Sequence, residues 1–306
     1  MFTRAIDRLI VRRVFSRVLG DAVRVGFGDD PVQPRSVGAS QPSLVVHDAG
    51  RLLSAMLAEG AVGFAVAYME GAWTTADLAG VLQAASMRID ARDDADSRTR
   101  WRGRWADNVR DSHDPRIREI GEHYDLGNEF YAAWLDASMS YSSAIFTDPS
   151  ESLEHAQARK YERLCALVDL RPGDRVLEIG CGWGGFAHYA VEHHDVTVTG
   201  LTLSRRQAAY AVERIASAGL GDRARIRLLD FRDVAGTYDK VVSIEMIESV
   251  DETLWPPLFE TIHRVLVPGG LAAMQAIVID ERYYESLLQR DDFIKRFIFP
   301  GGALPA

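Results

Sequence analysis

The chain has 306 residues, enough for one large domain or two modest ones. Its composition, with 47% hydrophobic and 26% charged residues, is that of a globular protein, and its net charge of -9 argues against nucleic-acid binding. The only cysteines are Cys165 and Cys181, so a reducing compartment is favoured over a disulfide framework. The eight histidines show no metal-ligand spacing, and we expect no metal site. No apolar run reaches the roughly 18 residues that a transmembrane span requires, so none is expected.

Residues 1–90 predict a small α+β domain that associates with lipid. The N-terminal stretch places apolar residues at helical spacing between arginines, at Ile6, Leu9, Ile10, Val14 and Leu19. The arginines interrupt any signal-peptide core. Two interpretations remain, a helix that lies on anionic lipid and an ordinary docking helix with a solvated basic face. The stretches "AVRVGFGD" and "PSLVVHD" predict strands, and "AGRLLSAMLAEG" predicts a helix that ends at Gly60.

Residues 91–116 predict a linker. The segment is rich in charges of both signs and lacks apolar periodicity. Its arginines alternate with Trp101 and Trp105, a pattern found in nucleic-acid-binding segments. The acidic neighbours favour a mobile connection between two domains instead.

Residues 117–306 predict an α/β domain with a Rossmann-like fold and a parallel sheet. Helical patterns begin near residues 152, 204 and 254, and they alternate with the strand candidates "RVLEIG", "VTVTGLT", "RIRLLD", "KVVSIEM" and "LAAMQAIVI". Such alternation predicts helices on both faces of the sheet. Ligands of these sheets bind beyond the carboxyl ends of the strands.

The loop "GCGWGG" after the first of these strands predicts a nucleotide site. Gly180, Gly182 and Gly185 fit G-x-G-x-x-G, which by itself does not distinguish NAD enzymes from others. The lysine of a P-loop is absent, and the second strand ends "GLTLS" without the acid that holds an NAD ribose. Acids stand instead at Glu178 and Asp230. This pattern favours a positively charged cofactor without phosphate, S-adenosylmethionine.

Five ordered motifs carry a family resemblance. They are "HYDLGNEFYAAWLDASMSYSSAIF", "VLEIGCGWGGF", "VTGLTLSRRQ", "EMIESV" and "FIFPGGALPA". Together they resemble the cyclopropane-fatty-acid synthase family, including the related enzymes that form methylene or methyl branches on lipid acyl chains. The resemblance implies an S-adenosylmethionine-dependent methyltransferase that acts on unsaturated phospholipid acyl chains. It also implies a bound bicarbonate ion that serves as the base.

The resemblance implies a role for each matching residue. The cofactor-binding residues would be Tyr141, Ser142, Glu178, Gly180, Gly182, Gly184, Thr202, Leu203, Gln207, Asp230, Phe231 and Arg232. The catalytic set would be Glu248 at the bicarbonate, Ser143, Gln275, Tyr124 and His123. The rings of Tyr124, Phe130, Tyr131 and Tyr141 would stabilise a cation through their π faces, or serve only as packing residues.

Three departures from the family pattern bear on the reaction. Ser143 replaces the cysteine of "YSC", and Gln275 replaces a bicarbonate-site histidine. Both keep hydrogen-bonding capacity, but they weaken the case for ring closure. The family's last strands and a further tyrosine would follow Ala306, so we expect the domain to be C-terminally truncated and this chain to be poorly active.

Several functions remain open. Cyclopropane formation competes with methylene or methyl branching, and the latter needs a flavin reductase partner. A homodimer is another expected partner. The expected location is cytoplasmic, at the inner face of the membrane. Alternatives are a catalytically weak protein that binds lipid or cofactor, a methyltransferase for a polar small molecule, and an NAD-dependent oxidoreductase.

Overall fold

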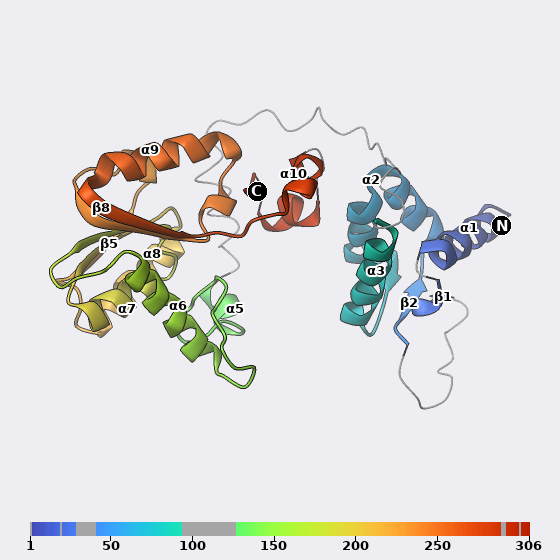
Figure 1. Cartoon of the computed structure of the whole chain (residues 1–306). Helices are drawn as coiled ribbons and strands as arrows, with labels where there is room; N and C mark the ends of the chain where they lie inside the picture. Colours follow the sequence, from blue (N-terminus) through green and yellow to red (C-terminus); the bar gives the residue numbers. More distant parts are fainter. Residues whose placement is uncertain (1, 19, 29–40, 94–126, 289–291, 300) are drawn as a thin grey trace. The chain divides into compact units, whose positions relative to one another are not determined.

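The computed structural model describes residues 2–18, 20–28, 41–93, 127–288, 292–299 and 301–306 (Figure 1). The chain divides into two compact units, residues 1–110 and 111–306, which are described separately. Most of the predicted linker lies outside the described residues. Its first residues belong to a helix, because α3 (Leu78–Asp93) continues through Asp93.

The N-terminal unit packs helices against a three-stranded sheet. The helices are α1 (Phe2–Val18), α2 (Ala49–Met69) and α3, with a short 3-10 turn, η1 (Gly20–Ala22). The sheet has the order β1 (Arg24–Phe27), β2 (Ser43–Val46) and β3 (Trp73–Thr74). The strands β1 and β2 run parallel, and β3 is antiparallel to β2. The sequence patterns predicted both β1 and β2, but not the short β3.

The helix α1 forms where the sequence predicts a helix, but it buries a different stripe. Val11 and Phe15 are buried in the core of this unit. Ile6, Leu9 and Ile10 are exposed instead. The apolar residues that predicted the helix are therefore mostly on its outer side.

The helix α2 continues past its predicted end. Gly60 has the non-helical angles φ 57° and ψ -123°, and the helix resumes on the far side of this kink. As a result, α2 is long and apolar enough to cross a membrane by length and composition, which corrects the expectation that no such stretch exists. Helices in protein cores pass the same test, and Leu52 and Ala67 of α2 are buried in the core of this unit.

The C-terminal unit contains a five-stranded, wholly parallel sheet. Its order is β6 (Ala224–Leu228), β5 (Thr197–Thr202), β4 (Arg175–Ile179), β7 (Tyr238–Ile244) and β8 (Leu266–Gln275). All adjacent pairs are parallel. The chain order reverses between β4 and β7, so the crevice beyond their carboxyl ends is the place where such sheets bind ligands.

Helices cover both faces of this sheet, as the alternation of patterns predicts (Figure 1). One face packs against α6 (Leu153–Leu167), α7 (Gly185–His194) and α8 (Arg205–Ser217). The other packs against α9 (Trp255–Val265). Neighbouring residues of β4 show the division, because Val176 belongs to the first core and Leu177 to the second.

Short elements complete the unit. They are α5 (Asn128–Ala132), the 3-10 turns η2 (Phe231–Asp233), η3 (Ile247–Ser249) and η4 (Glu252–Leu254), α10 (Glu281–Leu288) and the π-helical turn η5 (Ile294–Ile298). The last residues return to the sheet end, where the Ala303 N–H donates to the Glu248 carbonyl at 3.2 Å. The sequence patterns did not predict α10 or η5.

Candidate functional site

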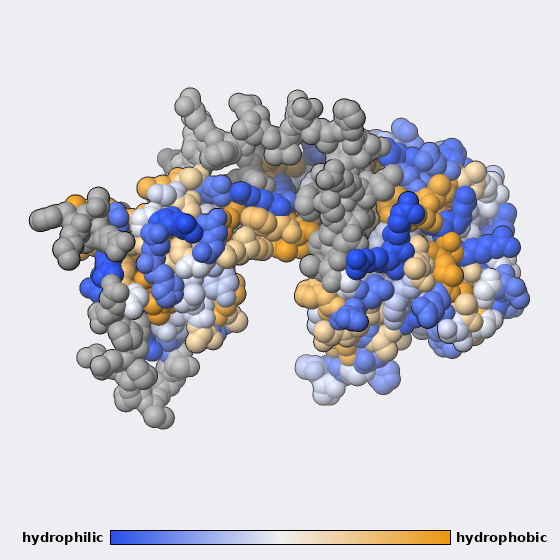
Figure 2. Space-filling model, turned by 180° about the vertical axis from the view of Figure 1, so that it is seen from behind, coloured by the Kyte–Doolittle hydropathy of each residue, from blue (hydrophilic) through white to orange (hydrophobic). Residues whose placement is uncertain are grey.

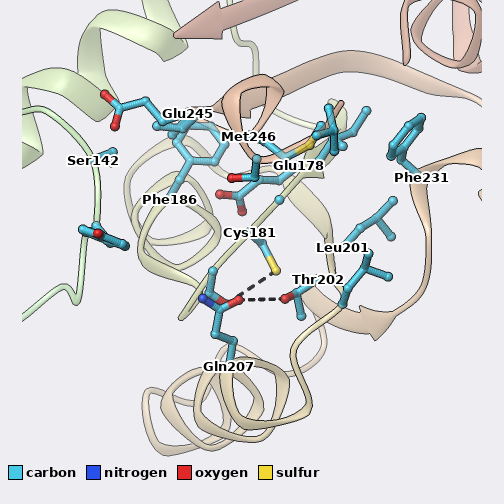
Figure 3. Close-up of a pocket in the computed structure, with 18 of the residues that line it drawn as sticks. Ser142, Glu178, Cys181, Phe186, Leu201, Thr202, Gln207, Phe231, Glu245 and Met246 are labelled. Carbon is cyan, nitrogen blue, oxygen red and sulfur yellow. Dashed lines mark hydrogen bonds between the residues drawn. The ribbon is translucent and has the colours of Figure 1, made fainter. Parts of the chain in front are cut away.

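A cavity of about 370 Å³ lies at the carboxyl ends of β4, β5 and β7. Figure 3 shows Ser142 and Glu245 on one side, Phe231 on the opposite side, and Glu178 between them. The volume falls within the range of small-molecule sites, about 300–1,000 Å³. The cavity therefore occupies the position that the parallel sheet predicts for a ligand.

The glycine loop after β4 forms one wall of this cavity. Gly180 has φ 84°, and a Cβ there would lie 2.6 Å from Met246 Cγ, so a side chain would collide with Met246. Gly182 also lines the cavity. Because these glycines carry no side chains, a ligand can approach the loop backbone closely.

Gly184 packs against α8. It is not among the residues that line the cavity, although both of its neighbours are. It has φ 78°, and a Cβ there would lie 2.9 Å from Ala211 Cβ of α8. Gly184 therefore permits close packing between the start of α7 and α8, and its contact with a cofactor stays a prediction.

Glu178 is the most deeply buried acid of the cavity, with 2% of its surface exposed. One carboxylate oxygen interacts with the backbone of Ala187 in the first turn of α7, where a helix favours negative charge. Its Oε2 is buried and has no hydrogen-bond partner in the described structure. Burial raises the pKa of Glu178 to about 8, against the opposing effect of the Lys160 charge. A buried acceptor without a donor fits a cationic ligand group.

The residues predicted for the ribose lie together at the end of β5. The Thr202 hydroxyl donates to Gln207 Oε1 at 2.9 Å (Figure 3), and both line the cavity with Leu203. Ser204 caps α8 by accepting from the Gln207 N–H. This cap positions the first turn of α8, and with it Gln207, at the cavity wall.

Asp230 and Phe231 line the cavity beyond β6, as predicted, but Arg232 does not. The Arg232 guanidinium forms a two-pronged interaction with the Asp230 carboxylate, with N–O distances of 2.9 and 2.7 Å. Arg232 therefore holds Asp230 in place instead of lining the cavity itself.

Tyr141 and Ser142 line the cavity, and Ser142 lies on the side opposite Phe231 in Figure 3. We call the segment that carries these two residues and Ser143 the rim. The Gln157 amide donates to the Ser142 carbonyl at 2.9 Å, and the Lys160 ammonium donates to the Ser142 hydroxyl at 2.6 Å. Both donors come from α6. The helix α6 therefore holds Ser142 in place through these two hydrogen bonds.

A carboxylate not predicted from the sequence joins two predicted residues. Glu245 Oε1 accepts from the Ser143 N–H at 2.9 Å and from the Gln275 amide at 2.8 Å. The same amide nitrogen also donates to the Ser143 carbonyl at 3.0 Å. Ser143 and Gln275 do come together, but around Glu245. The position of Glu245 directly after a buried strand was the available signal.

Glu248 lies outside the cavity lining, where it accepts a hydrogen bond from the Ile277 N–H. Its other oxygen, Oε2, is buried and has no partner among the described residues. Burial raises the pKa of Glu248. In this arrangement Glu248 does not share hydrogen bonds with Ser143 or Gln275, so the predicted catalytic cluster is only partly assembled.

Aromatic rings gather beside the rim. Tyr131 is buried and packs against Tyr141, Trp134 and Trp183, with ring centroids 4.8–5.9 Å apart. Trp183 lines the cavity, a role that was not predicted. Phe130 is half exposed and contacts Tyr131 edge-on. His123 and Tyr124, two predicted site residues, lie outside the described residues.

The charge of the cavity is one-sided. Its described lining residues include four acids, Glu178, Asp230, Glu245 and Asp251, and no lysine, arginine or histidine. Such a lining attracts a cation and disfavours a phosphate. The cavity therefore suits a cationic nucleotide better than a dinucleotide or a triphosphate.

The sheet order, the glycine loop and the cavity beside it define a Rossmann-like fold of the class I S-adenosylmethionine-dependent methyltransferases. Solved structures agree. Mycolic acid cyclopropane synthase CmaA1, in complex with SAH and CTAB, aligns with a TM-score of 0.58 and 30% identity over 64% of this chain and 72% of that one. The cyclopropane synthase MmaA2 from Mycobacterium tuberculosis aligns with a TM-score of 0.57 and 29% identity, covering 63% and 70%.

The chain belongs to the mycolic acid cyclopropane synthetase family, which it matches over residues 111–306. It is 36% identical to the tuberculostearic acid methyltransferase UfaA1 of Mycobacterium tuberculosis, over 100% of this chain and 71% of that protein. It is 40% identical to the cyclopropane-fatty-acyl-phospholipid synthase of Escherichia coli K12, over 60% of this chain and 46% of that protein. The chain thus spans about half to seven tenths of these relatives.

Proposed function

We propose that the C-terminal unit binds S-adenosylmethionine in the cavity and transfers its methyl carbon to the double bond of an unsaturated phospholipid acyl chain. The observation that carries this proposal is the unpartnered Oε2 of Glu178 in a cavity lined by acids. When bound, S-adenosylmethionine supplies a methyl group activated by a sulfonium. Its sulfonium and ammonium are cations, which match the sign of the lining.

The cavity lining offers a partner for each part of the cofactor. Glu178 Oε2 would accept a hydrogen bond from the methionine ammonium. Thr202 and Gln207 would contact the ribose, and Phe231 would cover the adenine ring. Asp230, held by Arg232, would accept from the adenine amino group. Each of these residues except Arg232 lines the cavity, which supports this orientation.

The aromatic cluster supports an apolar substrate. An alkene is a weak nucleophile, so it must be held in line with the activated methyl group. The positive charge left on the acyl chain would be quenched by water, whereas aromatic faces stabilise it. The ring of Tyr141 stacks on Phe299 at 6.3 Å, and burial raises the Tyr141 pKa, which keeps its phenol neutral. Exposed Phe130 and Trp134 contact Tyr131 and extend this cluster to the surface.

The residues around Glu248 do not fit a bicarbonate ion in this arrangement. The Gln275 amide donates to Glu245 and to the Ser143 carbonyl, and the Ile277 N–H donates to Glu248. These described donors are therefore engaged within the chain, and the unpartnered atom is a carboxylate oxygen, which repels an anion. We derive no step through bicarbonate.

Two products are compatible with the transfer, and both require the carbocation to lose a proton to a base. Loss from the transferred methyl group closes a cyclopropane ring, or, after a hydride shift along the chain, leaves a methylene branch that a reductase converts to methyl. The relative that matches the whole chain is named a methyltransferase, whereas the cyclopropane synthase of Escherichia coli matches 60% of it. Ser143 and Gln275, at which the sequence departs from the family pattern, also weaken the case for ring closure. We therefore favour the branched product, for which a reductase would complete the methyl group.

The N-terminal unit supports a location at the inner membrane surface. Its helix α1 exposes Ile6, Leu9 and Ile10, with Arg8 and Arg12 nearby against Phe27. In Figure 2, hydrophobic patches lie among hydrophilic residues on the visible face of the N-terminal unit. Apolar and basic residues on one helix suit an anionic lipid surface.

The test uses S-adenosylmethionine labelled in its methyl group and vesicles of dioleoyl or distearoyl phosphatidylglycerol. We expect label in the dioleoyl lipid only, and proton NMR then separates a ring from a branch. Binding of S-adenosylhomocysteine without any transfer would favour a non-catalytic binding protein. Label in a water-soluble acceptor instead of lipid would contradict the proposal.

A further inference from the structure

Lys160 is a buried charge to which the site described so far gives no chemical role. It lies on α6, has 0% of its surface exposed, and does not line the cavity. Its Nζ donates a hydrogen bond of 2.6 Å to the hydroxyl of Ser142, which does line the cavity. Only the Ser142 hydroxyl therefore lies between the Lys160 ammonium and the cavity along this hydrogen bond.

Burying an ammonium is costly, and an apolar side chain of similar length would fill the space at lower cost. Desolvation lowers the pKa of Lys160 to about 8, opposed by Glu245, Asp136 and Glu178, in that order. Nζ also lies 4.7 Å from the centre of the Tyr161 ring, whose π face favours a cation. The three carboxylates and the ring therefore offset part of the desolvation cost of the ammonium.

The acidic lining creates a requirement that Lys160 can meet. Methionine is a zwitterion, and its carboxylate would enter a cavity whose described lining residues carry four acids and no base. Arg232, at the Phe231 end, is already paired with Asp230. Glu178 can match the ammonium, but the carboxylate needs a donor and a positive charge close by.

The Ser142 hydroxyl can act as such a donor, because Lys160 donates to its oxygen. Because the Ser142 oxygen accepts from Lys160, its own hydrogen is free to donate to another group. Gln157 holds the Ser142 carbonyl, which fixes the residue at the rim.

We propose that Lys160 is a positioning residue that directs the Ser142 hydroxyl toward the carboxylate of the cofactor's methionine moiety and compensates its charge. This inference rests on the proposed cofactor. Glu178 would then face the methionine ammonium, and Lys160, through Ser142, would face the carboxylate. Lys160 itself makes no contact with the cofactor in this arrangement.

The test compares two ligands by titration calorimetry, S-adenosylhomocysteine and its decarboxylated analogue, S-adenosyl-3-thiopropylamine. For Lys160→Met we expect about tenfold weaker binding of S-adenosylhomocysteine, the scale of a hydrogen bond to a charged group, and less than about twofold change for the analogue. Ser142→Ala should show the same selective loss and remains informative if Lys160→Met does not fold.

Lys240→Met is the matched control, because Lys240 is also buried but lies in β7 outside the cavity lining. It should leave both affinities unchanged. An equal loss for both ligands in Lys160→Met and Ser142→Ala, or no loss for either, would overturn the role of Lys160. Failure of the unaltered protein to bind S-adenosylhomocysteine would instead overturn the proposed cofactor.

Discussion

The carboxylate of Glu245 accepts a hydrogen bond from the backbone N–H of Ser143 at 2.9 Å, although 102 positions separate them in the chain. Glu245 follows β7 in the left-handed region, with φ 46°, and its N–H donates to the Gln275 carbonyl at 2.8 Å. This conformation turns the side chain toward the rim. Glu245 therefore ties the rim segment to the ends of two strands.

Glu245→Ala should loosen the rim. It removes the acceptor of two hydrogen bonds, from the Ser143 N–H and the Gln275 amide, and a typical hydrogen bond contributes about 0.5–1.5 kcal/mol. We expect faster hydrogen exchange at Ser143 and several-fold faster dissociation of S-adenosylhomocysteine. Glu213→Ala, on an exposed part of α8, serves as the control. Unchanged exchange at Ser143 would show that Glu245 does not hold the rim.

Glu178→Gln should weaken cofactor binding while preserving side-chain volume. The amide can accept a hydrogen bond, but it lacks the charge that matches the methionine ammonium. We expect S-adenosylhomocysteine to bind at least about tenfold more weakly, as for other charge-assisted hydrogen bonds. Affinity equal to that of the unaltered protein would argue that the ammonium binds elsewhere.

The same substitution should change how stability depends on pH. Burial raises the pKa of Glu178 to about 8, from the ordinary 4.5. Between these values the unfolded chain has lost the proton that the folded protein keeps, so the stability contribution of Glu178 falls as pH rises. Glu178→Gln removes this loss.

The difference in melting temperature between Glu178→Gln and the unaltered protein should therefore grow from pH 5 to pH 8, to about 2–4 °C or more. Thermal unfolding followed by circular dichroism measures it without any ligand. A difference that stays constant with pH would mean that the carboxyl is already ionised in the folded protein at pH 5.

Gly184→Ala should destabilise the C-terminal unit through two effects. The residue has φ 78°, which is unfavourable for alanine by about 1–2 kcal/mol, and the new methyl group would lie 2.9 Å from Ala211 Cβ. Gly219→Ala is the matched control, with φ 71° and nothing within 4 Å of the added Cβ. Denaturant unfolding should show a larger loss for Gly184→Ala. Equal losses would exclude the packing role.

The sheet of the C-terminal unit was predictable because its strand candidates alternate with helical patterns along the chain. All five strand candidates correspond to strands, and α6, α8 and α9 formed where periodicity indicated helices. The continuation of α2 beyond its kink was harder to predict from the sequence. Gly60 ends one helical segment, but it does not prevent a second segment from following directly. The exposed stripe of α1 was also not predictable, since periodicity identifies an apolar face but not the surface it packs against.

The glycine loop and the strand-end residues of the site could be identified locally. The carboxyl ends of the strands meet at one edge of the sheet. Strand order alone therefore brings together Gly180 after β4, Thr202 at the end of β5 and Phe231 after β6. The roles of Glu245 and Lys160 depend on contacts between segments distant in sequence, 102 positions for Glu245 with Ser143 and 18 for Lys160 with Ser142. The cofactor role of Gly184 comes from the family resemblance, which does not reveal that Gly184 packs against Ala211 of α8.

The acidic cavity should select a cationic nucleotide without phosphate. Calorimetric titration of the protein with S-adenosylmethionine, and separately with NAD, tests this most directly. We expect one molecule of S-adenosylmethionine per chain, with binding that weakens in Glu178→Gln, and no measurable heat from NAD. Tighter binding of NAD, or equal binding of S-adenosylmethionine by the Glu178→Gln variant, would contradict the account.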